Sequence, residues 1–133
     1  MKLSKIVNQW IRYARTDLRV AKFNLEKSTE FKSSAAFHAQ QCAEKAVKGY
    51  LAFNKVRFQK THDLKALTID LSNINPILAK KISKAKSLTK YAVIYRYPDA
   101  ERKPLTVAQV KSAIKIAENV FEKCIEAIRE SKI

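Results

Sequence analysis

Glycine and proline are almost absent from this chain, which contains one glycine and three prolines among its 133 residues. A fold of short strands needs tight turns about every 8–12 residues, and such turns draw on these two residue types. A few long helices need far fewer turns. Because hydrophobic residues make up 47% of the sequence, each helix can also have an apolar face to bury. The sequence therefore predicts an all-α protein.

The hydrophobic residues recur at steps of three and four along most of the chain, as they do in amphipathic helices. We predict five helices, at about residues 4–27, 33–53, 64–71, 76–96 and 107–128. Thr106 and Gln109 have the spacing of a capping box at the start of the last one. No repeat, low-complexity tract or long linker divides the chain. The expected architecture is a single domain over residues 1–133, an up-and-down antiparallel bundle of five helices.

Local signals also set the boundaries of the third and fourth helices. The hydroxyl group of Thr61 is expected to cap the third helix. Asn75 followed by Pro76 should open the fourth, because a proline at the first helical position needs no N–H partner. Pro98 disfavours the α conformation in the residue before it, so the fourth helix should end at about Arg96.

The formal net charge is +15, from 27 basic and 12 acidic residues. Such an excess creates a positive field that attracts polyanions, including nucleic acids. It also keeps a small protein soluble without any binding role. Charge alone does not separate these two interpretations.

The two cysteines, Cys42 and Cys124, lie beside apolar residues in predicted helices. We expect two buried, reduced thiols rather than a disulfide. With His38 and His62 as the only histidines, the chain offers a poor set of zinc ligands, and we expect neither a metal nor a cofactor. The first residues lack the apolar run of a signal peptide, and no stretch of about 20 apolar residues could span a bilayer. A cytoplasmic protein without a membrane partner is therefore expected.

The second predicted helix has two organised faces. One is small and mostly apolar, with Ala39, Ala43, Ala46 and Tyr50 at helical spacing. The other carries Phe37, Gln41, Glu44 and Lys48. The alanines would let a neighbouring helix approach closely. We therefore expect this helix to be central, packed on one side and presenting chemistry or a partner surface on the other.

Three short motifs follow one another along the chain. They are Phe37-x-x-Gln40-Gln41-x-x-Glu44-Lys45-x-x-Lys48, then Thr61-His62-Asp63-Leu64, then Arg96-Tyr97-Pro98. In this order they resemble the HEPN domain family, and the similarity begins at Trp10 and Asp17-Leu18 in the first helix. It therefore covers nearly the whole chain.

The resemblance implies a HEPN-type helical bundle that binds a nucleotide or RNA. The chain is similar to HEPN proteins that are partners of minimal nucleotidyltransferases in toxin–antitoxin-like modules. The family resemblance and the alanine-rich central helix also predict a symmetric homodimer that buries about 1,600 Å² or more in total. A helical interaction module without catalysis is a further alternative.

His62, Arg96 and Tyr97 are candidate nucleotide- or phosphate-binding residues. His62 could bind a phosphate or transfer a proton near neutral pH, or it could simply belong to the start of a helix. Arg96 could offer a charged fork to a phosphate beside the aromatic face of Tyr97. Alternatively, an arginine at the end of a helix compensates the helix dipole.

Ribonuclease members of the family carry a histidine a short interval after the motif arginine. Here the residues after Arg96 are Tyr97-Pro98-Asp99-Ala100-Glu101-Arg102-Lys103, with no histidine. A metal-independent endoribonuclease would need Arg96 and His62 as its catalytic residues, with His62 brought from elsewhere in the fold. Arg57 precedes His62 by a suitable interval, but at the wrong place for the family, and we interpret this as coincidence.

Gln41, Glu44 and Lys48 complete the candidate site. Glu44 and Lys48 are four residues apart, as in an ordinary helix-stabilising ion pair. Near Arg96, this polar face could instead orient the arginine or hydrogen-bond a nucleotide. In the first helix, we expect Asp17 to pair with a nearby arginine.

Overall fold

The computed structural model describes residues 3–58 and 60–131, and every regular element within those ranges is helical. The prediction of an all-α fold is therefore confirmed. The α-helices are α1 (Lys5–Lys27), α2 (Lys32–Phe53), α3 (Leu64–Ile74), α4 (Pro76–Lys81), α5 (Lys90–Val93) and α6 (Val107–Ser131). Short 3₁₀ helices connect them: η1 (Thr29–Phe31), η2 (Ser83–Leu88) and η3 (Ile94–Arg96). None of these helices is long and apolar enough to cross a membrane.

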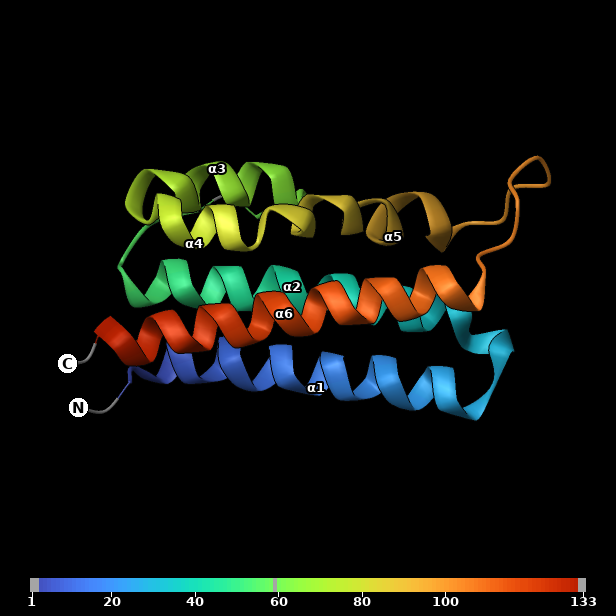
Figure 1. The fold of residues 1–133 in the computed structure, drawn as a ribbon, viewed down its shortest axis with the longest axis horizontal. Helices are drawn as coiled ribbons and strands as arrows, with labels where there is room; N and C mark the ends of the chain where they lie inside the picture. The colour runs from blue at the N-terminus through green and yellow to red at the C-terminus, as the bar shows by residue number, and fades with distance from the viewer. Residues whose placement is uncertain (1–2, 59, 132–133) are drawn as a thin grey trace.

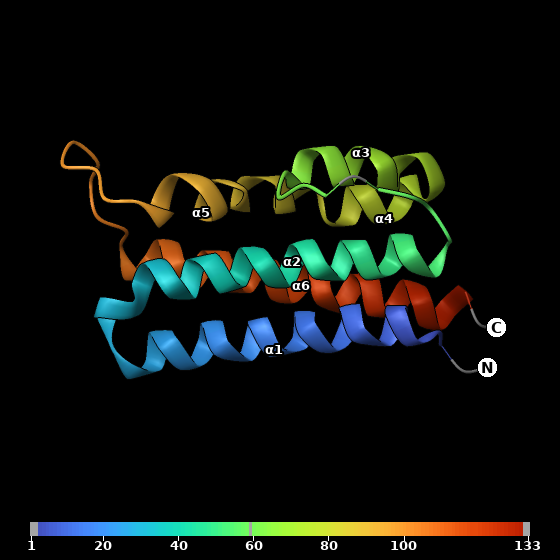
Figure 2. The same cartoon turned by 180° about the vertical axis from the view of Figure 1, so that it is seen from behind.

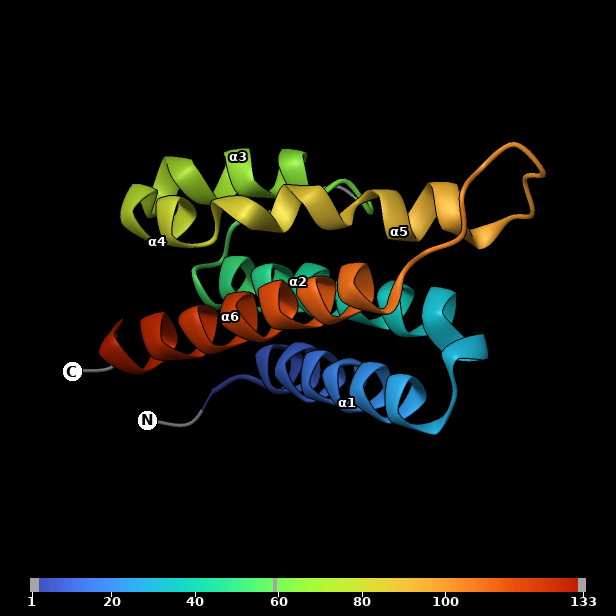
Figure 3. The same cartoon turned by 45° about the vertical axis from the view of Figure 1, so that its right-hand side comes forward.

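The helices form three layers (Figures 1 and 3), with α1 on one side, α2 and α6 in the middle, and α3 with the α4–α5 segment on the other side. Helices α1 and α4–α5 run in one direction, and α2, α3 and α6 run in the other. Helices α2 and α3 can run the same way because residues 54–58 and 60–63 lead back along α2 before α3 begins (Figure 2). Helix α2 therefore touches both outer layers and α6.

Helix α2 is buried along most of its length, as its alanine-rich face predicts. Ala39, Ala43 and Ala46 are all buried, and Tyr50 is only 4% exposed. Near its end, Gly49 allows α1 to approach, since a Cβ at that position would lie 3.1 Å from the Cβ of Trp10. The prediction of a central second helix is confirmed.

Two of the predicted helix starts are confirmed in detail. Asn75 caps α4, its side chain accepting a hydrogen bond from the Leu78 N–H at 3.0 Å, and Pro76 is the first helical residue. The capping box opens α6 with two reciprocal hydrogen bonds, of 2.9 and 3.1 Å, between Thr106 and Gln109.

The predicted cap of the third helix is wrong by two residues. Asp63 caps α3 by accepting a hydrogen bond from the Lys65 N–H. Thr61 instead accepts a hydrogen bond from the Asp63 N–H at 3.0 Å, which orders the residues before the helix. Both residue types cap helices well, so the local sequence did not distinguish them.

The predicted fourth helix begins and ends near the expected residues but is not one continuous α-helix. It is divided into α4, η2, α5 and η3. Its buried residues explain the division, because Ile82, Ala85, Leu88 and Tyr91 recur at steps of three. A 3₁₀ helix has three residues per turn, so this winding keeps all four side chains toward the core.

Both cysteines are buried and unpaired by disulfide. Burial raises the pKa of the Cys124 thiol to about 12, and burial likewise raises the pKa of the Cys42 thiol. Both side chains are therefore neutral thiols at physiological pH, and they serve as small apolar residues of the core.

Candidate functional site

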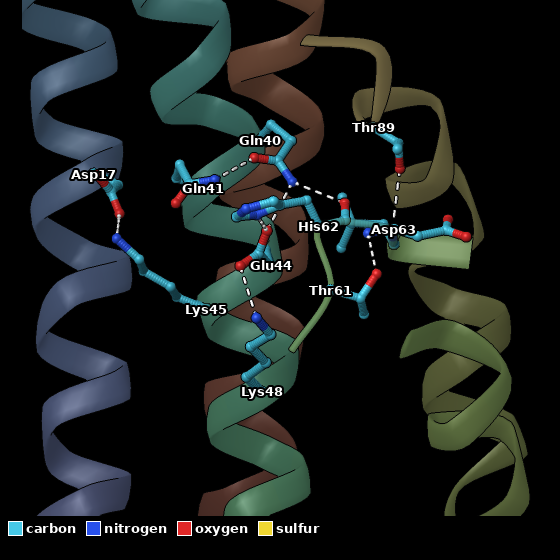
Figure 4. A network of polar contacts seen from close by, with 11 residues as sticks. Asp17, Gln40, Gln41, Glu44, Lys45, Lys48, Thr61, His62, Asp63 and Thr89 are labelled. Atoms are coloured by element: carbon cyan, nitrogen blue, oxygen red, sulfur yellow. Dashed lines mark hydrogen bonds and ion pairs between the residues drawn. The ribbon is translucent and has the colours of Figure 1, made fainter. Parts of the chain in front are cut away.

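A buried carboxylate lies at the centre of the polar network in α2 (Figure 4). The side chain of Glu44 is only 4% exposed. Its Oε2 accepts a hydrogen bond from the Lys48 ammonium group at 2.9 Å, and its Oε1 accepts one from the Gln40 amide at 3.1 Å. Its Oε1 also lies 2.8 Å from Nδ1 of His62. A buried carboxylate is costly unless such partners surround it, and here both oxygens have them.

The Glu44 carboxylate determines how the His62 ring is oriented. An ionised carboxylate can only accept hydrogen bonds, so Nδ1 of His62 must be the donor. In a neutral ring, Nε2 is then an acceptor, and in a protonated ring it is a second donor. Because 60% of the His62 side chain is exposed, the Nε2 edge can meet a ligand. The pair is therefore a fixed imidazole that can bind a phosphate or transfer a proton.

Gln40 attaches the chain segment that carries His62 to α2. Its amide nitrogen donates to the backbone carbonyl of His62 at 3.2 Å as well as to Glu44. Its amide oxygen accepts a hydrogen bond from the Gln41 amide at 2.7 Å. A fully buried side chain thus fixes both the histidine backbone and the carboxylate that holds its ring.

Two aromatic rings enclose the ammonium group of Lys48. Its Nζ lies 5.7 Å from the ring centroid of Trp10 and 5.9 Å from that of Phe58. These two rings also make an edge-to-face contact with each other. A cation over an aromatic face gains electrostatic stabilisation that grows as water is excluded. The predicted Glu44–Lys48 pair therefore exists, but inside the protein rather than on its surface.

The polar face expected on α2 is consequently an internal one. Gln41, Glu44 and Lys48 are 9%, 3% and 7% exposed. This face was expected to present chemistry or a partner surface, but these three side chains are buried, and Trp10 of α1 and Phe58 before α3 lie against Lys48. What the network offers to a ligand is the ring of His62.

A second polar cluster joins α1 to α2. The carboxylate of Asp17 accepts hydrogen bonds from Nδ1 of His38 at 2.9 Å and from Nζ of Lys45 at 2.6 Å. The prediction that Asp17 pairs with an arginine is therefore wrong. Burial by itself raises the pKa of this carboxyl group, but the hydrogen bonds from His38 and Lys45 outweigh it, and the pKa of Asp17 is lowered.

Arg96 and Tyr97 lie at the end of η3, where the loop to α6 begins. The described part of the structure includes the backbone of Arg96 but not its side chain. Tyr97 is 68% exposed. Its carbonyl accepts a hydrogen bond from the guanidinium group of Arg102, which also binds the carbonyl of Ile94, both at 2.7 Å. The same guanidinium lies 4.7 Å from the ring centroid of Tyr95, so Arg102 fixes the backbone on both sides of Arg96.

The structure places His62 and η3 at different levels of α2. His62 contacts Glu44, whereas Tyr95 of η3 lines a hollow with Lys32 and Ser33 in the first turn of α2. Between residues 33 and 44 a helix rises about 16 Å. Gln41, Glu44, Lys48 and His62 are thus brought together, and the end of η3 lies elsewhere (Figures 1 and 2).

Two residues of this region were not among the predicted site residues. Gln40 stands four residues before Glu44, a spacing that places both on one helix face, and this could have revealed it. Arg102 gave no such signal, because its partners are backbone carbonyls of η3 and the loop. Within residues 3–58 and 60–131, no three of the His, Cys, Asp and Glu side chains gather where a metal could bind.

Comparison with known families and proteins gives consistent matches. The HEPN domain model matches residues 7–128. A protein of Methanocaldococcus jannaschii named "Putative toxin MJ1304" is 30% identical, over 95% of this chain and 90% of that protein. The crystal structure of TT1696 from Thermus thermophilus is similar with a TM-score of 0.76 and 25% identity, over 92% of this chain and 98% of that one. The structure of ST0689, described as an archaeal HEPN homologue, is similar with a TM-score of 0.70 and 28% identity, over 96% and 99% of the two chains.

Asp17→Asn should lower the free energy of unfolding at about pH 5 by about 1–2 kcal/mol, since it removes a carboxylate that two donors share. The folded-state pKa of Asp17 lies below its ordinary value of 3.8. Its stabilising contribution is therefore present above that value and is lost as the pH falls through the folded-state pKa. The difference between wild type and variant should shrink between about pH 5 and about pH 2. Urea unfolding followed by circular dichroism measures it.

The control for this experiment is Glu122→Gln, which changes an exposed carboxyl group on α6. This substitution should have a small effect on the free energy of unfolding over the whole pH range. A difference between wild type and Asp17→Asn that stays constant with pH would contradict the assigned role of Asp17.

Glu44→Gln should destabilise the protein by about 3 kcal/mol, because it leaves the buried Lys48 ammonium group without its counter-charge. Thermal and urea unfolding measure the loss. The matched control is Glu118→Gln, which breaks the exposed pair with Lys22 on α1 and should cost less than about 1 kcal/mol. Adding Lys48→Met to Glu44→Gln should restore part of the lost stability. Equal effects of the two glutamate substitutions would refute the buried role of Glu44.

Proposed function

This chain belongs to the HEPN domain family, and we propose that it binds a nucleotide or RNA as the partner of a minimal nucleotidyltransferase in a toxin–antitoxin-like module. The observation that carries the binding function is the oriented, exposed imidazole of His62 above the buried Glu44 carboxylate. The net charge of +15 supports a polyanionic ligand.

The family and a named relative support the proposed biological context. The Methanocaldococcus jannaschii protein that is similar over 95% of this chain has the word toxin in its name. A toxin needs a partner that restrains it, and the sequence motifs resemble HEPN proteins that pair with minimal nucleotidyltransferases. We propose that the ligand-binding residues are His62 with Arg96 and Tyr97, and that Gln41, Glu44 and Lys48 support His62.

A metal-independent endoribonuclease is the second candidate function, and the Glu44–His62 pair favours it. A carboxylate that holds the imidazole through Nδ1 leaves Nε2 to accept or donate a proton, which is what a general base or acid requires. Cleavage also needs a second group on the scissile phosphate. Arg96 is the sequence candidate for that group, but η3 lies at a different level of α2 from His62, and no histidine follows Arg96 in the manner of the ribonuclease members.

We further propose that the protein acts as a symmetric homodimer. Several large hydrophobic side chains remain exposed on one chain, among them Tyr13 and Phe23 of α1, at 52% and 57%. An interface of about 1,600 Å² or more could cover such residues. The positive charge opposes association, so the centre of the interface should be apolar.

The decisive experiment separates binding from cleavage. Wild type, Arg96→Ala and His62→Ala would be tested with a mononucleotide and with labelled single-stranded RNA, without added metal. Wild type should bind, and binding should weaken as salt increases. Arg96→Ala should reduce affinity about 10- to 100-fold if it removes a charge-assisted contact of about 1.5–3 kcal/mol. RNA turnover should be slow in all three proteins.

The same measurements can overturn the proposal in two ways. Robust cleavage by wild type that is lost in either variant would establish the ribonuclease function instead. Absence of both binding and cleavage in every variant would leave a helical interaction module. Lys60→Gln is a suitable control, because it removes an exposed charge close to His62 in the sequence without touching the Glu44 network.

A further inference from the structure

A groove lined by lysines together with polar and apolar side chains runs between the α4–α5 segment and α6. Its larger hollow has a volume of about 540 Å³ and is lined by Lys81 and Lys84 on one side and Lys115 on the other. A second hollow of about 350 Å³ continues from it, sharing Ser112 and Ile116 of α6, and is lined by Lys90. The two hollows thus adjoin each other along α6, with lysines beside both, and together they are called the groove below.

No carboxylate lines either hollow among the described residues. Lys81, Lys84 and Lys115 are exposed, and none of them forms an ion pair within the described ranges. Hydroxyl and amide side chains stand between the lysines. Those of the two hollows are Ser83, Ser87, Gln109, Ser112 and Asn119.

The acidic residues of α6 do not line this groove. Glu118 pairs with Lys22 of α1, so it turns toward a different layer. Toward the end of α6, a neighbouring hollow shares Lys81 and is also lined by Glu126 and Glu130. The basic stretch therefore has a defined end, and a negatively charged chain in the groove would run from Lys81 toward Lys90.

We propose that this groove binds the sugar–phosphate backbone of a single nucleic-acid strand. Lysines contact phosphates as point charges, and hydroxyl and amide groups donate hydrogen bonds to phosphate oxygens. A positively charged groove that follows the backbone is the usual means of binding single strands without sequence preference. Hollows of about 540 and 350 Å³ can hold parts of one strand but are too small for a duplex.

The groove is separate from the site at His62. It opens along α6, which lies in front of α2 in Figure 1, beside the α4–α5 segment. The segment that carries His62 crosses in front only in the opposite view, in Figure 2. The groove thus deepens the proposed function, on which the choice of a nucleic-acid ligand rests, by giving a longer strand a second place to bind.

The test uses a fluorescein-labelled oligouridine of about 12 nucleotides, with affinity measured by anisotropy across a range of salt concentrations. The groove variant is Lys81→Gln/Lys84→Gln/Lys115→Gln. It should bind about tenfold or more weakly, and the slope of log affinity against log salt should fall by about 2, since each lost phosphate contact contributes about 0.7. The three lysines are exposed, so the variant should fold and unfold like wild type.

The matched control is Lys5→Gln/Lys27→Gln/Lys65→Gln, which changes the formal charge equally at exposed residues that line neither hollow. It should change affinity about threefold or less and leave the salt slope nearly unchanged. Equal losses of oligouridine affinity in the two triple variants would overturn the proposal that the groove binds a strand. Absence of oligouridine binding by wild type would overturn it as well.

Failure of the groove and failure of the function proposed above have different signatures. If only the groove is wrong, His62→Ala and Arg96→Ala still weaken mononucleotide binding. If only the His62 site is wrong, the groove variant still loses oligouridine affinity and salt slope relative to its control.

Discussion

The buried carboxylate of Glu44 is the interaction on which the candidate site depends. A carboxylate inside a helical bundle requires partners for both oxygens, and these partners come from three places in the sequence. Lys48 and Gln40 stand one turn away on α2, and His62 comes from the segment before α3. By binding the ring of His62 while Gln40 binds its backbone, the network fixes a solvent-facing imidazole on a buried base. Without the carboxylate, little in the described contacts would orient that ring.

Three acidic residues pair with cations away from the lysines of the groove. Asp17 and Glu44 lie in the interior, where each neutralises cations at the α1–α2 contact or within α2. Glu118 is paired with Lys22 on α1. Among the residues that the structure describes, no carboxylate lines the groove beside the lysines of η2 and Lys115 of α6. The groove is therefore basic.

Much of the fold was predictable because its signals are local. The Asn75–Pro76 start and the Thr106–Gln109 capping box each depend on residues within one turn, and both are found as expected. The break in the fourth helix had a signal too, since Ile82, Ala85 and Leu88 recur at three residues rather than 3.6. The candidate site was harder to predict from the sequence. The spacing of Glu44 and Lys48 predicts their ion pair, but its burial depends on Trp10 and Phe58, which sequence spacing cannot place beside it. Likewise, no local rule relates Arg102 to the carbonyls of Ile94 and Tyr97.

The most direct test of the Glu44-centred account is the protonation state of the two ring nitrogens of neutral His62, observed by nitrogen-15 NMR of histidine-labelled protein. The hydrogen bond to Glu44 requires a proton on Nδ1 and leaves Nε2 unprotonated. In Glu44→Gln this preference should weaken, while the spectrum of His38, held by Asp17, should be nearly unchanged. A neutral His62 protonated mainly on Nε2 in the wild-type protein would contradict the account.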